Sequence, residues 1–426
     1  MSNNNLEMKT TETPSSAGDV ISSQDSSEIT VISEIPTLVK TPEAVPSGWV
    51  TPAIEPLLAR WSPSVEESTD EQTWLKQLEI RLKGSLQQFQ LQAKIQKSIL
   101  TPNAGLVKFV GSSNLTVEQV LKRRSELLTT YGLNVISVTP EPGIISIAVE
   151  RPSRQIVHLP ELWKRWQPET LGGNQEILIG VREADGELLF LSPGKHHAPH
   201  TLIAGSTGSG KSVLIQNIIL GVAATNTPAQ AKIVLIDPKQ GVDYFQLDAL
   251  PHLDGGLIDE QTAALEKLQS LVSEMDRRYS LFKAARANNL AAYNRKVSEE
   301  QKLPAIWVVH DEFAEWMMVE EYKEEVTALV GRLGVKARAA GLYLVFAAQR
   351  PDANVMPMQL RANLGNRLIL RVDSEGTSEI ALGERGAERL LGRGHLLARL
   401  EGLPLTYAQV PFIEEDFLQD LAEALQ

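Results

Sequence analysis

The sequence contains no cysteine, which excludes disulfide bonds, thiolate metal sites and thiol nucleophiles. Aromatic residues make up only 5% of the 426 residues, and no apolar run approaches the roughly 18 residues of a membrane span. The polar, Ser/Thr-rich start lacks the apolar core of a signal peptide, and no internal repeat is present. These absences predict a cytoplasmic protein, and a hydrophobic content of 42% allows two or three globular domains.

Acidic charge is concentrated near the start of the chain. The formal net charge is -12, and residues 1–74 supply -9 of it, with twelve Asp and Glu against three Lys and Arg. Residues 330–400 have the opposite balance, with eleven basic against six acidic side chains. A polyanion could bind this basic region locally; the alternative is that its charges lie on solvated helix faces.

Composition and periodicity divide the chain into three parts. Residues 1–72 are rich in Ser, Thr, Pro and Glu and are expected to form a disordered acidic tail. Residues 73–165 predict a small α+β domain, with helices over 74–96 and 116–131 and strands over 106–110, 135–138 and 144–149. In residues 166–426 strands and helices alternate, which predicts an α/β fold, a parallel sheet flanked by helices. Its expected strands are 201–204, 232–237, 305–311, 342–348 and 367–372, with a long helix over 261–287.

A glycine-rich motif lies between the first of these strands and the next helix. It spells G-x-x-x-x-G-K-S, and with the residue that follows it comprises Gly205, Ser206, Thr207, Gly208, Ser209, Gly210, Lys211, Ser212 and Val213. Its glycines let several backbone N–H groups point at one polyphosphate. Lys211 would then contact the β and γ phosphates and Ser212 would bind Mg²⁺. The pattern predicts a site for ATP and Mg²⁺; the alternative is a Gly/Ser-rich surface turn.

Two later strand ends carry the groups that hydrolysis needs. The strand over 305–311 ends in Asp311 and Glu312, about a hundred residues after Lys211. Asp311 would hold the Mg²⁺ shell, and Glu312 would polarise the attacking water. If the strand over 342–348 lies between the strands of Lys211 and Asp311, Gln349 would sense the γ-phosphate. The alternative is a polar residue in a solvated turn.

Together with these sites, several motifs give the chain a resemblance to the motor of the FtsK/SpoIIIE DNA translocases. They are Ile236-Asp237-Pro238-Lys239, Pro251-His252-Leu253, Glu274-Met275-Asp276-Arg277-Arg278-Tyr279, Asp311-Glu312-Phe313-Ala314-Glu315, Ala337-Arg338-Ala339-Ala340-Gly341, Gln349-Arg350-Pro351 and Gly386-Ala387-Glu388-Arg389-Leu390-Leu391-Gly392. The likeness covers about residue 177 to the C-terminus, and residues 75–162 are similar, less closely, to that family's α domain.

The resemblance implies a RecA-like ATPase core that assembles into a hexameric ring and moves double-stranded DNA through its pore. Arg338 matches the family's arginine finger, which reaches the ATP of the neighbouring subunit. Pore elements are expected around 240–249 and 352–363, with Arg361 and Lys239 as candidate DNA contacts.

The departures from the family pattern define the alternatives. The family's Ser-Ser-Lys, Asp-Ser-Arg and Gly-Asp-Met-Leu are here Asp373-Ser374-Glu375, Thr377-Ser378-Glu379 and Gly394-His395-Leu396-Leu397. Glu375 replaces a lysine expected to act across the subunit interface, which would weaken hydrolysis unless Arg371 or Arg385 compensates. Neither the family's membrane-spanning N-terminus nor its winged-helix module is recognisable, so neither septum anchoring nor sequence-guided direction is expected.

The first hypothesis is an ATP-driven double-stranded DNA translocase. The alternatives are a nucleotide-dependent DNA-binding switch or scaffold, and a conjugative coupling ATPase.

Three histidines precede the glycine-rich motif. His196, His197 and His200 could suggest a metal site, but no nearby carboxylate completes one, so a structural loop is expected.

Overall fold

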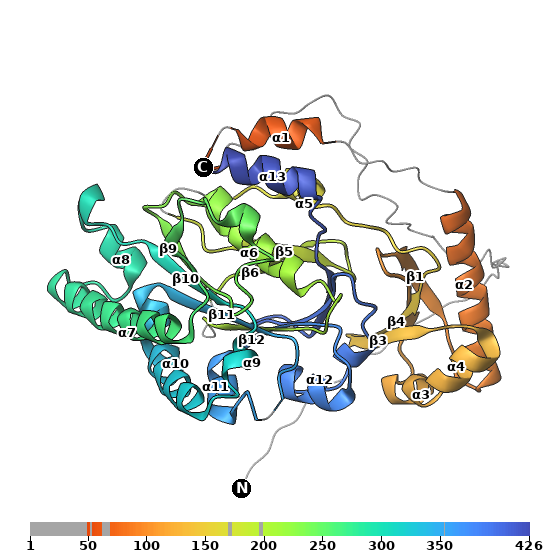
Figure 1. The fold of residues 1–426 in the computed structure, drawn as a ribbon. Coiled ribbons are helices and arrows are strands. Elements are labelled where there is room, and N and C mark those ends of the chain that lie inside the picture. Colours follow the sequence, from red (N-terminus) through yellow and green to blue (C-terminus); the bar gives the residue numbers. More distant parts are fainter. Residues whose placement is uncertain (1–48, 52, 62–68, 169–172, 196–198, 353) are drawn as a thin grey trace, which may run out of the picture.

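A computed structural model describes residues 49–51, 53–61, 69–168, 173–195, 199–352 and 354–426. Within them the chain forms a large α/β part and a smaller α+β part that lies beside it (Figure 1). Each part has its own hydrophobic core.

The large part contains a ten-stranded sheet in the order β6-β5-β14-β13-β12-β7-β11-β10-β8-β9. Its strands are β5 Ile177–Arg182, β6 Leu188–Leu191, β7 Thr201–Ala204, β8 Ala231–Ile236, β9 Leu253–Ile258, β10 Ala305–His310, β11 Leu342–Ala348, β12 Asn366–Leu370, β13 His395–Arg399 and β14 Thr406–Gln409. The five strands expected from the sequence are present, each within one or two residues of its expected bounds. They pair in parallel, and every residue of β7, β10 and β11 is buried.

The sheet is mixed rather than purely parallel. Among the described strands, β13, β14, β5 and β6 pair antiparallel at one end of the sheet. Only residues 400–405 connect β13 to β14, and so short a link permits antiparallel pairing but not the crossover that parallel strands require.

Helices cover both faces of this sheet, which confirms the expected α/β fold. In Figure 1, α6, α5, α13 and α1 lie on one side and α10, α11 and α12 on the other. The helices of this part are α1 Ile54–Arg60, α5 Leu159–Arg165, α6 Lys211–Thr225, α7 Gln261–Ala284, α8 Leu290–Asn294, α9 Phe313–Trp316, α10 Glu320–Ala340, α11 Met358–Asn363, α12 Glu375–Leu382 and α13 Glu415–Ala424, with short 3-10 turns at Phe245–Leu247, Glu299–Gln301 and Ala387–Arg389. Helix α6 is buried almost all round, because it packs between the sheet and the outer helices.

The start of the described chain corrects the expected disordered tail over 1–72. Helix α1 buries Ile54 and Leu58 in the core of the large part. Just before it, the Trp49 ring stacks on Trp163 at 4.8 Å between centroids, and Val50 N–H donates to Ala224 O over 3.0 Å. A few apolar residues inside a Ser/Pro-rich sequence give no periodic signal, so composition alone missed this anchor. Residues 1–48 lie outside the described residues.

The small part has a four-stranded antiparallel sheet in the order β1-β2-β4-β3. Its elements are α2 Thr69–Gln88, β1 Ile95–Leu100, β2 Ala104–Val110, α3 Val117–Lys122, α4 Arg124–Tyr131, β3 Val135–Glu141 and β4 Ile144–Glu150. The helix expected over 74–96 ends at Gln88, and β1 was missed. The helix expected over 116–131 is divided at Arg123, where ψ is 5°.

Along the chain, the residues change from the core of the small part to the core of the large part before the expected boundary at residue 165. The core of the small part extends to Val149, whereas Val157, Leu159, Leu162 and Trp163 belong to the core of the large part. Helix α5 is therefore packed with the large part.

Candidate nucleotide site

The glycine-rich loop is anchored by the strands on both sides of β7. Gly205 N–H donates to Ala348 O at the end of β11 over 3.2 Å, and Ser206 N–H donates to Arg371 O beyond β12 over 2.8 Å. Gly210 precedes α6 with a φ of 102°, which a residue with a side chain rarely adopts. The loop that connects the buried β7 to α6 is therefore held in place, and the N-terminal end of α6 points at this loop.

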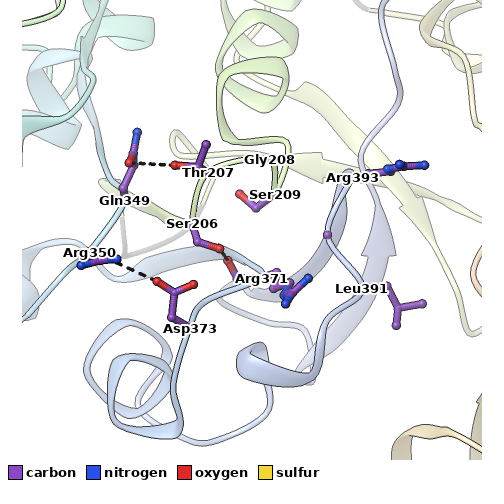
Figure 2. A pocket seen from close by; sticks show the side chains of 11 residues that line it. Ser206, Thr207, Gly208, Ser209, Gln349, Arg350, Arg371, Asp373, Leu391 and Arg393 are labelled. Carbon is purple, nitrogen blue, oxygen red and sulfur yellow. Dashed lines mark hydrogen bonds and ion pairs between the residues drawn. The ribbon is translucent and has the colours of Figure 1, made fainter.

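A pocket of about 470 Å³ opens over this loop. Figure 2 shows the side chains around it, which include Thr207, Gln349, Arg371 and Arg393. Three of the lining side chains are arginines, and the single carboxylate among the lining residues, Asp373, lies 3.6 Å from Arg350. The pocket is therefore electropositive, as a polyphosphate requires.

Lys211 lies against the two carboxylates that end β10. Its Nζ forms an ion pair with Asp311 Oδ1 and lies 3.5 Å from Glu312 Oε2. All three side chains are buried. The residues that the sequence separates by a hundred positions therefore meet at one place, because β7 and β10 end at the same edge of the parallel sheet.

Asp311 has a second partner that the sequence did not predict. Tyr244 donates its hydroxyl to Asp311 Oδ2 over 2.6 Å. Burial and the negative charge of Asp311 raise the pKa of Tyr244 well above its usual value, so the phenol stays a hydrogen-bond donor. A Tyr in a loop after β8 carries no sequence signal for this role.

Glu312 is held in a strained backbone conformation. Its φ is 40°, the left-handed region that few residues other than glycine adopt. Oε1 accepts from Gln349 N–H over 3.1 Å, and Oε2 lies 3.3 Å from Lys239 Nζ. The carboxylate is thus directed between the ends of β10 and β11.

The expected magnesium ligands lie at the start of α6 and the end of β10. Ser212 Oγ donates to Asp243 Oδ2 over 2.7 Å, and Asp311 lies against Lys211. Hydroxyl and carboxylate oxygens are the ligand types that Mg²⁺ prefers. Within the described residues no group of three or more His, Asp or Glu is placed to hold a metal ion.

Ser209 gives a further sign that the loop fits a phosphate. Its Oγ is buried and has no hydrogen-bond partner, so a phosphate oxygen placed over the loop would accept from it.

Gln349 lies beside the glycine-rich loop. Strand β11 runs between β7 and β10, the order on which its predicted position depended. The Gln349 Oε1 accepts from Thr207 Oγ1 over 3.3 Å (Figure 2). Its predicted sensor role remains a proposal.

Arg338 lies away from this site within the same chain. It precedes β11 in the last turn of α10, whereas Gln349 follows β11, so the seven residues of the strand separate them by roughly 23 Å at about 3.3 Å per residue. Its guanidinium contacts Lys195 O over 3.4 Å. An arginine finger at this position would act on the nucleotide of another subunit.

The two candidate DNA contacts differ from free surface cations. Lys239 pairs with Glu312, within the site. Arg361 is partly buried in α11, where Nη1 donates to Ile380 O over 3.5 Å. Their roles towards DNA remain proposals.

The carboxylates that replace the family's basic residues are paired within the chain. Arg385 lies 2.8 Å from Glu375 and 2.6 Å from Glu379. Arg385, one of the two arginines named as possible compensators, therefore pairs with both carboxylates, but its single positive charge offsets only one of them. All three side chains are about half exposed, so the pairs contribute little stability.

His200 has a structural role. Its ring is fully buried, Nδ1 accepts from Leu344 N–H over 3.1 Å, and burial lowers its pKa to about 4. His196 and His197 lie outside the described residues. In the part of the chain that the structure describes, no helix is both long and apolar enough to cross a bilayer.

Comparison with known proteins places these features in a family. Residues 183–353 match the model of the FtsK/SpoIIIE family. A DNA translocase FtsK of Streptococcus agalactiae is 33% identical over 392 residues, which cover 87% of this chain and 47% of the relative. Another, from Halalkalibacterium halodurans, is 30% identical over 91% of this chain and 49% of its own length. This chain therefore spans about half the length of the curated relatives it matches.

Solved structures show the same fold. The conjugation coupling protein TcpA of pCW3, in a monomer form with ATPγS, superposes with a TM-score of 0.54 at 23% identity, over 79% of this chain and 95% of that one. The cytoplasmic domain of the type VII secretion ATPase EccC of Thermomonospora curvata gives 0.53 at 25% identity, over 61% of this chain and 32% of that one. The fold is that of a P-loop ATPase, and through residues 183–353 the chain belongs to the FtsK/SpoIIIE family.

Proposed function

We propose that this chain is an ATP-dependent double-stranded DNA translocase of the FtsK/SpoIIIE type. The observation that carries the proposal is the meeting of Lys211, Asp311 and Glu312 beneath the glycine-rich loop. Bound ATP would supply the scissile phosphoanhydride bond, and Mg²⁺ would neutralise the negative charge of its phosphates. The DNA translocase relatives support DNA as the partner.

The residues of the chain divide the work of hydrolysis. Residues 205–213 hold the phosphates through backbone N–H groups and the Lys211 ammonium. Ser212 and Asp311 hold Mg²⁺, with Asp243 beside Ser212. Glu312 accepts a proton from the attacking water, and its fixed backbone keeps the carboxylate pointed at the end of β11. Gln349 lies where it would register the γ-phosphate.

Hydrolysis would take place between subunits of a hexameric ring. Because Arg338 lies at the opposite end of β11 from Gln349, it would complete the site of a neighbouring subunit and stabilise transition-state charge there. DNA would pass through the pore and contact Arg361 and residues 240–249, mainly through its phosphates. The protein would act in the cytoplasm, with the small part of the structure as its small domain and the large part, which includes helix α5, as its motor domain.

A nucleotide-dependent DNA-binding switch or scaffold is the second candidate. Glu375 and Glu379 favour it, since they stand where the family has basic residues. Their pairing with Arg385 uses that cation within the chain and leaves no positive charge in excess among these three side chains to act across an interface. A conjugative coupling ATPase would perform the same motor chemistry for a membrane channel, and capture of a membrane partner would support it.

Translocation on a DNA track separates the candidates. A translocase displaces a bound roadblock from linear double-stranded DNA in an ATP-dependent manner, and Glu312→Gln abolishes the displacement. A switch assembles on DNA when nucleotide is added and leaves the roadblock in place. The latter outcome would overturn the translocase proposal.

A further inference from the structure

Residues 391–394, here called the bridging loop, lie between the glycine-rich loop and the small part of the molecule. Arg393 N–H donates to Gly208 O over 3.3 Å, and Gly394 N–H donates to Ser209 O over 2.7 Å. The contact is close, because a Cβ on Gly210 would lie 2.7 Å from Gly394 N. Gly392 and Arg393 also line the nucleotide pocket (Figure 2). One side of the bridging loop therefore helps to fix the shape of the phosphate site.

The other side of the bridging loop is held by Arg154. This residue lies between β4 and α5, where its neighbour Gln155 donates its N–H to Pro102 O in the turn between β1 and β2. Arg154 Nη1 donates to Leu391 O over 3.2 Å, and Nη2 donates to Gly392 O over 2.9 Å. One guanidinium thus binds two successive carbonyls of the bridging loop, which fixes both position and orientation.

Asn103, in the turn between β1 and β2, connects the same loop to the small sheet. Its Oδ1 accepts from Arg154 Nε over 2.7 Å, and its Nδ2 donates to Glu183 over 2.6 Å and to Gln409 Oε1 over 2.9 Å. Gln409 in turn donates to Arg393 O over 2.9 Å. Asn103, Glu183 and Gln409 are buried, so each polar group here depends on its partner rather than on water.

His395 completes the support at a position where the family has an aspartate. Its Nδ1 accepts from Leu391 N–H over 3.2 Å, and its Nε2 lies 3.4 Å from Glu183 Oε1. Although burial opposes ionisation of Glu183, His395 and Asn103 lower the pKa of this carboxyl. The bridging loop is therefore bound on one side to the phosphate site and on the other to the small part.

We propose that the bridging loop couples nucleotide binding to docking of the small domain, with Arg154 as the positioning residue. The proposal rests on the proposed function of residues 205–213 as the nucleotide site. When Arg154 and Asn103 hold the loop, the Gly208 and Ser209 backbone is fixed for phosphate. By linkage, bound nucleotide then stabilises the contacts of Arg154 and Asn103 to the same extent. The small domain thereby responds to the nucleotide state of its own subunit.

The test is the affinity of the full chain for a fluorescent ATP analogue. Arg154→Ala is expected to weaken binding about tenfold, within the usual range of coupling between sites. Arg154→Gln, which retains one donor group, is expected to lie between Arg154→Ala and the wild type. The matched control is Arg151→Ala, because Arg151 bonds Thr101 O over 2.9 Å and pairs with Glu71 without touching the bridging loop. Its affinity is expected to equal that of the wild type.

Hydrogen exchange distinguishes coupling from a merely structural role. Saturating nucleotide is expected to slow exchange at the amides of Thr101, Ala104 and Arg151 in the wild type, and to have no effect there in Arg154→Ala. Unchanged affinity and unchanged protection in Arg154→Ala and Arg154→Gln would overturn the proposal. If Lys211→Ala instead leaves nucleotide binding intact, the nucleotide site itself is wrong, so the two failures are distinguishable.

Discussion

Two glycines of the phosphate loop provide a sensitive comparison, because both have positive φ but only one is crowded. Gly208 has a φ of 76°, and a Cβ added to it would meet nothing within 4 Å, whereas Gly210 has a φ of 102° and its Cβ would meet the Gly394 backbone at 2.7 Å and 3.0 Å. Gly208→Ala carries only the left-handed penalty, about 1–2 kcal/mol. Gly210→Ala adds an overpacking penalty of about 1–3 kcal/mol, so its total cost is about 2–5 kcal/mol.

The assay is urea unfolding followed by tryptophan fluorescence, together with the affinity for a fluorescent ATP analogue. Gly210→Ala is expected to unfold at a clearly lower urea concentration than Gly208→Ala. It is also expected to bind nucleotide more weakly, because the strain displaces the backbone N–H groups that face phosphate. Equal midpoints and equal affinities for the two variants would show that the Gly394 backbone does not crowd Gly210.

Three further predictions concern the interface, the DNA contact and the pH dependence of stability. Arg338→Ala is expected to slow hydrolysis by about 10³-fold or more without weakening nucleotide binding; mixing it with Lys211→Ala subunits should restore part of the rate, and no recovery would contradict an action in trans. Arg361→Ala is expected to weaken binding of double-stranded DNA and to reduce the salt slope of log K by about one; an unchanged slope would remove Arg361 from the DNA contacts. Burial lowers the pKa of both His200 and His310 from 6.5 to about 4, so the folded state binds fewer protons than the unfolded state between these values. Their contribution to stability is therefore complete above pH 6.5 and decreases as the pH falls towards 4, and a urea midpoint that stays constant over this range in the wild type would contradict it.

The central strands and the nucleotide loop could be predicted because their signals are local. Continuous apolar runs predict β7, β10 and β11, whereas the position of β11 between the other two entered the prediction for Gln349 only as a condition, which the structure meets. The loop over 205–212 is specified by glycines at fixed spacing. Each of these features depends on residues that are close together in the sequence, so the spacing of residue types is enough to predict it.

The rest of the site depends on contacts between distant residues. Tyr244 meets Asp311 across 67 positions, and Arg154 meets Gly392 across 238. No spacing rule connects such pairs, since only the packed fold brings them together. The anchor at Trp49 and helix α1 was missed for the same reason: its apolar residues are few, and the core that buries them comes from α5, α6 and α13.

The charge reversals at Glu375 and Glu379 are visible in the sequence, but the partners of these carboxylates are not. The sequence indicated a loss of positive charge and offered Arg371 and Arg385 as compensators. Only the structure shows that Arg385 pairs with both carboxylates, while the Arg371 side chain lines the pocket.

The most direct test of motor activity is the rate of ATP hydrolysis with and without linear double-stranded DNA. A translocase is expected to hydrolyse ATP faster when DNA is present. Lys211→Ala is expected to abolish hydrolysis through loss of nucleotide binding, and Glu312→Gln to slow it by about 10²–10⁴-fold while binding is retained. Nucleotide binding with little hydrolysis and no response to DNA would contradict the translocase proposal, and would favour the switch in which Glu375 and Glu379 mark the loss of motor activity.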